Sequence, residues 1–313
     1  MFVLAHLSDP HLGPLPRPRM RELASKRFLG YVNWCHGRDA IHRVEAIEAI
    51  TADLRRERPD HVAVTGDLVN IALPSEFERA RQWLESLGSP SDVSLVPGNH
   101  DAYVRAAAIH RDRHWAPYMK GDPVPGREAA AGFPYVRRRA GVALVGLSTA
   151  VVTPAFMATG RLGGPQMARA AEILAELGAA GLFRVVMIHH PPGAAPSWPH
   201  KRLTDAAAFR RMIAEAGAEL LIHGHDHTHA LTWLAGKGAR VPAVGVPSAS
   251  VWPRPNPHPL AEERWEGTAA AYNLYRIGAS TGAFTCEVVS RSLRRTGAVA
   301  EIGRYALSWS DKR

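Results

Sequence analysis

The chain has 313 residues, 46% of them hydrophobic, and a formal net charge of +9 at neutral pH. That hydrophobic content is enough for a buried core in one large domain. No apolar run approaches the roughly 20 residues of a membrane-spanning helix. The N-terminus enters an apolar run directly, without a basic segment and a cleavage site, so we expect no signal peptide. Two cysteines make no disulfide framework, and we expect reduced thiols in a cytoplasmic protein.

The excess positive charge is spread over several short basic clusters. The simplest interpretation is solvated surface charge, and the alternative is attraction to anionic substrates or to an acidic membrane surface. The clusters lack the interleaved aromatic residues of a single-strand nucleic-acid platform, so we expect no dedicated nucleic-acid module. The clusters lie at Arg17, Arg19 and Arg21, at Lys26 and Arg27, at Arg55 and Arg56, at 137–139, and at Arg294 and Arg295.

The first apolar run, residues 2–7, is followed closely by two side chains that can bind metals. We expect a buried strand over 2–7, with Asp9 and His11 just beyond its C-terminal end. A carboxylate and an imidazole two residues apart can hold one metal ion from a short loop. An Asp-x-His pair alone occurs by chance in many proteins, so its meaning depends on the rest of the chain.

Four later apolar runs end in the same way, at 62–65, 93–96, 185–188 and 220–222. Open α/β sheets place their sites at the C-terminal ends of strands, and this repeated arrangement is hard to explain by coincidence. The clusters that follow these runs are Gly66-Asp67, Pro97-Gly98-Asn99-His100-Asp101, His189-His190-Pro191-Pro192 and His223-Gly224-His225-Asp226-His227.

The order of these motifs resembles that of the calcineurin-like metallophosphoesterases. The order is Asp-x-His, Gly-Asp, Gly-Asn-His-Asp, His-x-Pro and Gly-His-x-His, from Asp9 to His227. The set is highly specific for a two-metal hydrolase and poorly specific for its substrate. The resemblance implies an α/β fold in which two mixed β-sheets face each other, helices flank them, and a dinuclear metal site lies at strand C-terminal ends.

The resemblance also implies a set of metal ligands. Phosphoester hydrolysis needs charge neutralisation at the phosphoryl oxygens and a nucleophile near neutral pH, and two divalent ions about 3.5–4 Å apart supply both. Asp67 matches the family's bridging carboxylate. The mixed nitrogen and oxygen donors suit Mn, Fe, Zn or Co better than Mg or Ca, and the sequence does not select among them. Asp9, His11 and His227 would complete the first metal site, and Asn99, His189 and His225 the second.

His100 is the candidate for transition-state chemistry, because it directly follows Asn99 and matches the family's catalytic histidine. It would donate a hydrogen bond to a phosphoryl oxygen or protonate the leaving alkoxide. Phosphoprotein phosphatases pair this histidine with an aspartate three residues after the bridging one, but here that position is Asn70. We therefore expect an amide to orient a less basic imidazole. Asparagine at this place is more similar to the bacterial phosphodiesterase branch, which includes cyclic-nucleotide and glycerophosphodiester hydrolases.

Neighbours of the expected ligands are candidates for supporting roles. His190 is less favoured as a ligand than His189, because the family's ligand lies two residues before the proline. Asp101 would anchor its loop, and His223 and Asp226 would support the ligands from the second layer or line the substrate pocket. Residues 245–248 and 271–274 also resemble the phosphodiesterase branch, and we favour sheet packing and a turn over pocket lining for both.

Between the motifs, hydrophobic spacing predicts helices that alternate with the strands. This alternation favours stacked βα units and a largely buried sheet. Beyond His227 the pattern changes to short alternating runs, which we expect to form antiparallel strands of a second sheet. Helices are predicted over 40–57, 75–87, 102–119, 165–177 and 204–216, a strand pair over 133–139 and 142–148, and late strands over 230–234, 241–246, 271–277 and 284–289.

We expect a single domain over residues 1–313, with an inserted cap-like segment at 14–38 and a C-terminal antiparallel strand region at 230–313. The insertion opens with Pro14, Pro16 and Pro18, which disfavour a helix there. From Met20 its pattern is that of a short amphipathic segment. The simplest interpretation is a flap packed beside the site. The alternatives are a cap that contacts substrate, which its position directly after two expected ligands makes attractive, and a membrane-surface patch.

The motifs predict an enzyme, a dinuclear metal-dependent phosphohydrolase, most simply a phosphodiesterase that uses a metal-activated hydroxide. One alternative is a diphosphate hydrolase acting on a lipid-linked nucleotide such as a UDP-diacylglucosamine, which the basic and aromatic insertion motivates. Another is a nuclease. A binding scaffold is disfavoured, because every expected ligand is present. The expected partner is a phosphorylated small-molecule or lipid-linked substrate, with peripheral membrane contact through 14–38 and homo-oligomerisation left open.

Overall fold

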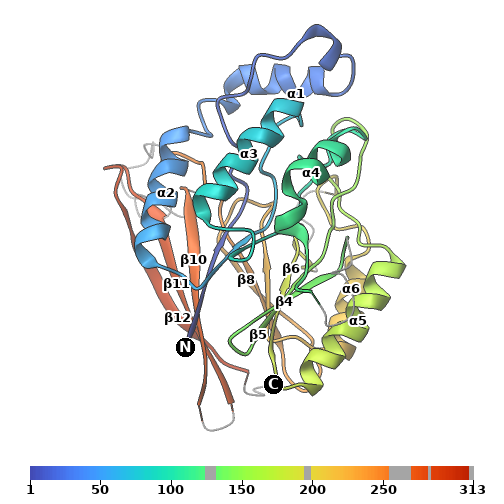
Figure 1. The fold of residues 1–313 in the computed structure, drawn as a ribbon, viewed down its shortest axis with the longest axis vertical. Helices are drawn as coiled ribbons and strands as arrows, with labels where there is room; N and C mark the ends of the chain where they lie inside the picture. Colours follow the sequence, from blue (N-terminus) through green and yellow to red (C-terminus); the bar gives the residue numbers. More distant parts are fainter. Residues whose placement is uncertain (124–131, 194–198, 254–268, 281–282, 310–313) are drawn as a thin grey trace.

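Two β-sheets face each other in the computed structural model of the protein, and helices cover their outer faces (Figure 1). The structure describes residues 1–123, 132–193, 199–253, 269–280 and 283–309. This architecture confirms the predicted α/β fold with two mixed sheets. Among the described residues, no helix has both the length and the apolar character needed to cross a membrane.

The first sheet joins the beginning of the chain to its end. Its strand order is β12-β11-β10-β1-β2-β3, with β1, β2 and β3 parallel and the late strands antiparallel. The parallel strands deliver their C-terminal ends to one edge of the sheet. The strands are β1 (Phe2–Leu7), β2 (His61–Val64), β3 (Val93–Leu95), β10 (Ala271–Ser280), β11 (Ala283–Leu293) and β12 (Val299–Leu307).

The second sheet has the order β4-β5-β6-β7-β9-β8. Strands β5, β6, β7 and β9 are parallel, and β4 and β8 are antiparallel edge strands. The strands are β4 (Tyr135–Arg139), β5 (Val142–Gly146), β6 (Phe183–Met187), β7 (Leu220–His223), β8 (Ala230–Leu234) and β9 (Val241–Gly245).

The prediction for the late strands was therefore wrong in its topology. They do not form a sheet of their own: β8 and β9 complete the second sheet, and β10 to β12 extend the first. Strand β9 also runs parallel to β7 rather than antiparallel. Strand β12 lies within the antiparallel strand region predicted over 230–313, but its own range was not predicted. Alternation along a strand reports which face is buried, but it carries no information about which distant strand supplies the hydrogen bonds.

The helices begin and end near the predicted positions, with two differences. Helix α2 starts at Val44 rather than at residue 40, because residues 38–42 form a further turn at the end of the insertion. Helix α4 starts at Ala107 rather than at residue 102, because turns follow the 98–101 motif. Helix α3 begins with proline in its first turn and ends at Leu87, directly before Gly88. The helices are α1 (Arg27–Asn33), α2 (Val44–Glu57), α3 (Pro74–Leu87), α4 (Ala107–Trp115), α5 (Gly164–Ala179) and α6 (Ala206–Ala216).

The second sheet is buried on both faces, which explains its nearly continuous apolar strands. In β6, Val185 and Met187 join the core between the sheets, while Val186 packs among the apolar residues of α5 and α6. Successive side chains of a strand point to opposite faces, so one run serves two cores. A shift of one residue would turn every side chain of the strand to the wrong face, so the strand register is fixed. The positions of the loops at the strand ends are fixed with it.

The insertion at 14–38 is folded onto the same end of the molecule as the strand C-termini (Figure 1). The guanidinium of Arg27 is buried and donates hydrogen bonds to the carbonyls of Ile71 and Ala72, and Trp34 is also buried. Arg137 is likewise buried and donates to several main-chain carbonyls. Part of the basic excess thus anchors loops, so the interpretation of this charge as solvated surface was wrong for these two arginines.

Candidate metal centre

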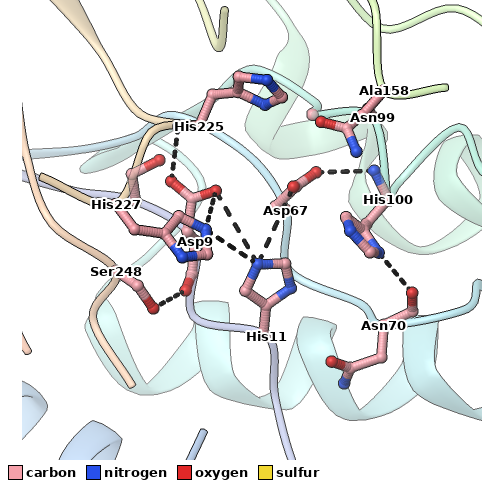
Figure 2. Close-up of polar contacts among 12 residues, drawn as sticks. Asp9, His11, Asp67, Asn70, Asn99, His100, Ala158, His225, His227 and Ser248 are labelled. Atoms are coloured by element: carbon pink, nitrogen blue, oxygen red, sulfur yellow. Dashed lines mark hydrogen bonds and ion pairs between the residues drawn. The ribbon is translucent and has the colours of Figure 1, made fainter. Parts of the chain in front are cut away.

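The seven expected ligands come together at the C-terminal ends of β1, β2, β3, β6 and β7, where five of them line one cavity. Figure 2 labels six of the seven, all except His189. Parallel strands from two facing sheets deliver these loops to the same edge, so residues far apart in the sequence meet there. Asp9 and His11 follow β1, Asp67 follows β2, Asn99 follows β3, His189 follows β6, and His225 and His227 follow β7.

Asp67 lies between two groups of donor atoms. Its Oδ2 is 4.0 Å from Nε2 of His11 on one side and 3.4 Å from Nε2 of His189 on the other. The other oxygen, Oδ1, accepts a hydrogen bond from the main-chain amide of His100 at 2.7 Å, so Oδ2 is the oxygen that faces both donor groups. The arrangement is compatible with the bridging role that the sequence predicts for Asp67.

The first group of donors is held together by Asp9. Its Oδ1 is 3.1 Å from Nε2 of His227, which is in turn 3.3 Å from Nε2 of His11. The other oxygen of Asp9 accepts a hydrogen bond from the main-chain amide of His225. One oxygen therefore faces the donor group while the other is fixed by the chain (Figure 2).

The second group of donors is centred on His189. Its Nε2 is 3.2 Å from Oδ1 of Asn99 and 3.2 Å from Nδ1 of His225. Two imidazole nitrogens and an amide oxygen thus face a common point beside Asp67, as the predicted second metal site requires.

The outer nitrogens of these imidazoles fix which nitrogen is free to bind a cation. Nδ1 of His189 donates to the carbonyl of Thr65 at 2.6 Å, and Nε2 of His225 donates to the carbonyl of Lys201 at 2.9 Å. A neutral ring that donates through one nitrogen presents a lone pair at the other. With both rings neutral, the inner nitrogens of His189 and His225 would be two acceptors that face each other at 3.2 Å, so a proton on one ring or a cation between them is required.

The backbone is unusual at the site. Five of the expected ligands have positive φ angles: Asp9 (52°), His11 (39°), Asp67 (55°), His225 (72°) and His227 (55°). Non-glycine residues seldom adopt this left-handed conformation, which costs on the order of 1 kcal/mol or more each and clusters at functional sites. The backbone strain therefore occurs at the same residues whose side chains converge.

The charges of the site also favour a cation. Burial alone would raise the pKa of Asp67, but His189 and then His100 lower it to about 2. Burial alone would lower the pKa of His189, but the charge of Asp67 raises it to about 10. Positive charge opposite Asp67 is therefore strongly stabilised, and the donor set fits divalent ions that accept nitrogen and oxygen ligands.

His100 lies at the same cavity, but Asn70 does not orient it as expected. Nδ1 of His100 donates to the main-chain carbonyl of Asn70 at 2.5 Å, whereas the side-chain amide of Asn70 donates to the carbonyl of Leu12 at 3.2 Å. The expectation that the amide orients this imidazole was wrong. A main-chain carbonyl can make this contact whatever the side chain, so residue identity alone could not reveal it.

The supporting candidates have separate roles. The Asp101 carboxylate accepts hydrogen bonds from main-chain amides of both the 66–69 and the 98–101 loops, as expected of an anchor. His190 uses both ring nitrogens, with Thr149 Oγ1 and the Ala158 carbonyl, which supports His189 as the ligand. His223 is buried, and its Nδ1 contacts the carbonyl of Gly224, while Asp226 lines the cavity.

The two stretches that resemble the phosphodiesterase branch lie outside the cavity lining. Ser248 is buried and donates to the main-chain carbonyl of Asp9 at 2.6 Å, so it supports the first loop from behind (Figure 2). Asn273 belongs to β10 and accepts a hydrogen bond from Ser290 on β11 at 2.8 Å. Both contacts are structural, as favoured from the sequence.

Arg38 is a site residue that sequence reasoning missed. It is the last residue of the insertion, and its Nη2 is 3.1 Å from Nε2 of His11 while its Nη1 is 3.4 Å from Nε2 of His100. His42 was also missed: it is buried, its ring centroid is 4.6 Å from that of His11, and its Nδ1 shares a hydrogen bond with Ser250. The only signal for Arg38 was its place in a basic insertion, and His42 belongs to no motif.

The cavity above these residues has a volume of about 530 Å³. Arg38, His100 and Lys201 lie on its walls together with five of the expected ligands. Its size is in the range of small-molecule sites, and its walls combine cationic and hydrogen-bonding groups. The arrangement suits an anion bound against the metal centre.

Comparison with known proteins agrees with this geometry. The chain is 32% identical over 133 residues to the glycerophosphodiester phosphodiesterase GpdQ of Enterobacter lignolyticus, a match that covers 42% of this chain and 40% of the relative. It is 28% identical over 209 residues to a probable cyclic nucleotide phosphodiesterase, syc0937_d, of Synechococcus sp., covering 65% of this chain and 70% of the relative. The match to GpdQ therefore spans less than half of that relative's length.

Solved structures share the fold at low sequence identity. A dimetal phosphatase from Danio rerio superimposes with a TM-score of 0.59 at 12% identity, over 99% of both chains. The purple acid phosphatase PPD1 of yellow lupin gives a TM-score of 0.61 at 12% identity, over 98% of this chain and 53% of the other.

The sequence model of the calcineurin-like phosphoesterases matches residues 2–229, a stretch that contains every motif of the metal centre. This match covers well over half of the chain, and the structural likeness supports it. The chain therefore belongs to the calcineurin-like phosphoesterase family, a family of metal-dependent phosphoester hydrolases.

Proposed function

We propose that the protein hydrolyses phosphodiesters at a dinuclear metal centre. The observation that carries the proposal is the convergence of the six other expected ligands around Asp67, beside a cavity that Arg38 and His100 also line. When bound, two divalent ions neutralise the phosphoryl charge and make a water nucleophilic near neutral pH. Mn, Fe, Zn and Co all suit this mixed donor set.

The residues of the chain would hold the phosphoryl group in place. The Arg38 guanidinium presents several donors in a planar fork that suits phosphoryl oxygens. His100 is fixed through Nδ1, so its Nε2 faces the cavity, where it can bond to a phosphoryl oxygen or to the leaving oxygen. Burial lowers the pKa of His100 to about 4, with Asp67 raising it and Arg38 lowering it. An anionic substrate beside the ring would raise that pKa again.

A diester is favoured over a monoester by the surroundings of His100. Its Nδ1 bonds to the Asn70 carbonyl rather than to a carboxylate of the described residues. Both relatives are named for phosphodiesters, a glycerophosphodiester in one and a cyclic nucleotide in the other. A diester carries less negative charge than a monoester, so it requires less cationic compensation from the protein.

The test is Mn²⁺-dependent turnover of bis(p-nitrophenyl) phosphate beside p-nitrophenyl phosphate, with and without a chelator. We expect chelator-sensitive turnover that favours the diester, and loss of turnover in Asp67→Ala and Asn99→Ala. Asp112→Ala, at an exposed position of α4, is the matched control. Full activity of either site variant, or preference for the monoester, would refute the proposal.

A lipid-linked diphosphate is a second candidate substrate, because apolar side chains of the insertion are exposed to solvent. Met20 is 86% exposed and Phe28 is 53% exposed, and Arg17, Arg19 and Arg21 lie near them in the sequence. Exposed apolar groups among cations are typical of surfaces that bind anionic membranes. Sedimentation with anionic vesicles should detect binding that Met20→Ser with Phe28→Ser abolishes. Equal binding of wild type and variant would remove this candidate.

A further inference from the structure

A second cavity, of about 420 Å³, adjoins the metal centre on the side of His100. The two cavities share part of their walls, so a ligand can extend from one into the other. The shared residues are Asn33, Arg38, Asn99, His100, Ala158 and Lys201.

The remaining walls of this second cavity are mainly apolar and aromatic. Leu29 comes from the insertion, Ile71 from the loop after β2, Tyr103 from the turns after the 98–101 motif, and Phe156 and Met157 from the segment before α5. Leu29, Phe156 and Met157 are 41%, 83% and 40% exposed. A ligand that covers such side chains gains free energy by removing apolar surface from water.

Contacts join the segments that form the walls of this cavity. Nζ of Lys26 donates to the carbonyl of Thr153 at 2.8 Å and lies 4.3 Å from the ring centroid of Tyr103. The Tyr103 ring is stacked on His100, with centroids 5.7 Å apart and planes at 14°. The cavity wall is thus continuous with the imidazole at the metal centre, as expected of a preformed site.

We infer that this cavity binds the alcohol that leaves during hydrolysis, and that it selects an aromatic or similarly bulky apolar alcohol. The inference rests on the proposed function. In that reaction the oxygen of water bonds to phosphorus, the bond from phosphorus to the leaving oxygen breaks, and the leaving oxygen takes up a proton, which gives a phosphomonoester and an alcohol. His100 lies at the boundary of the two cavities, so an oxygen bonded to it places its substituent against Tyr103, where rings stack favourably.

The experiment varies the wall and the substrate together. Wild type, Leu29→Ala and Met157→Ala are assayed with bis(p-nitrophenyl) phosphate and with p-nitrophenyl methyl phosphate, whose aryl group is also its leaving group. We expect each variant to lower kcat/KM by about tenfold, and by the same factor for both substrates, because both place the leaving aryl group in the cavity. Ile109→Ala, at a 72% exposed position of α4, is the matched control and should leave both rates unchanged.

Two kinetic outcomes would overturn the inference. A loss confined to bis(p-nitrophenyl) phosphate would mean that the cavity holds the arm that stays on phosphorus. No loss with either substrate would mean that the cavity contacts neither arm.

Calorimetry separates failure of this inference from failure of the proposed function. With Mn²⁺ present, phenylphosphonate should bind about tenfold more tightly than methylphosphonate, and Leu29→Ala should remove most of that preference. Equal affinities in the wild type would overturn the inference whether or not the protein is active. A phenyl preference in a protein that hydrolyses no diester would overturn the phosphodiesterase and support the cavity as an aromatic site.

Discussion

The carboxylate of Asp101 accepts a hydrogen bond from the main-chain amide of Asp67 at 2.8 Å. The same oxygen accepts from the amide of Gly98 at 2.9 Å, and the other oxygen accepts from Leu68 at 2.9 Å. One buried side chain thus joins the loops after β2 and β3, which carry the bridging carboxylate and Asn99. Burial and then the charge of Asp67 raise the pKa of Asp101 to about 7, so these amide donors have to offset the cost of a second buried carboxylate.

We predict that Asp101→Asn destabilises the fold by about 2–4 kcal/mol, because the new amide group would present a donor to main-chain donors and leave them unsatisfied. The two loops should also separate, so the variant should bind less Mn²⁺ per chain. Urea denaturation and metal analysis after gel filtration measure the two effects. Asp112→Asn, at an exposed position, serves as the control. Wild-type stability and metal content in Asp101→Asn would contradict the anchoring role.

Arg38 provides a second prediction. If its guanidinium binds phosphoryl oxygens, Arg38→Ala should lower kcat/KM for bis(p-nitrophenyl) phosphate by about 100-fold, the effect of removing one strong donor from an oxyanion. Arg38→Lys should fall between the two, because lysine keeps the charge but not the planar fork. Inhibition by inorganic phosphate should weaken in the same order.

The control for Arg38 is Arg43→Ala, since Arg43 is a nearby arginine whose side chain is 44% exposed. Phosphate inhibition that is equal in wild type and Arg38→Ala would show that the guanidinium does not contact the anion.

Asn70 tests whether the main chain or the side chain orients His100. Because Nδ1 of His100 bonds to the Asn70 carbonyl, we expect Asn70→Ala to keep kcat within about threefold of wild type, while His100→Ala should lose about 100-fold or more. The lost hydrogen bond to the Leu12 carbonyl should cost about 1 kcal/mol of stability. If Asn70→Ala were as inactive as His100→Ala, the side chain would be the orienting group after all.

That the expected ligands would come together could be predicted from the sequence, because they sit in short motifs at strand ends. An apolar run that ends in Asp67 or His189 specifies both a buried strand and a donor at its C-terminal end, and parallel strands bring such ends together. The positions of Arg38 and His42 depend instead on how the insertion folds back over the loops, and that follows from contacts such as Arg27 with the Ile71 carbonyl. Contacts with main-chain atoms leave no mark in residue identity.

The pairing of the late strands was hidden for a similar reason. Strand β9 lies beside β7, and β10 lies beside β1, across large separations in sequence. Burial patterns show that these strands have covered faces, but the main-chain hydrogen bonds that choose their neighbours are the same for every residue type.

His61 gives a prediction for stability that is independent of the metal centre. It is 1% exposed, its Nε2 shares a hydrogen bond with Ser94 Oγ at 2.8 Å, and burial followed by the charge of Arg137 lowers its pKa to about 3. In the unfolded chain the pKa is about 6.5. Between pH 6.5 and 3 the unfolded state therefore binds a proton that the folded state does not, so the free energy of unfolding falls as the pH falls, by up to about 1.4 kcal/mol per pH unit from this residue.

We expect His61→Asn, which cannot titrate there, to have a shallower pH dependence of stability over that window, by up to about one proton. Urea denaturation at a series of pH values from 7 to 4 measures the slope. Ile109→Ala, at a 72% exposed position of α4, should keep the wild-type slope. Parallel curves for wild type and His61→Asn would mean that His61 takes up its proton in the folded protein, and that the buried ring beside Ser94 opens to water before the fold is lost.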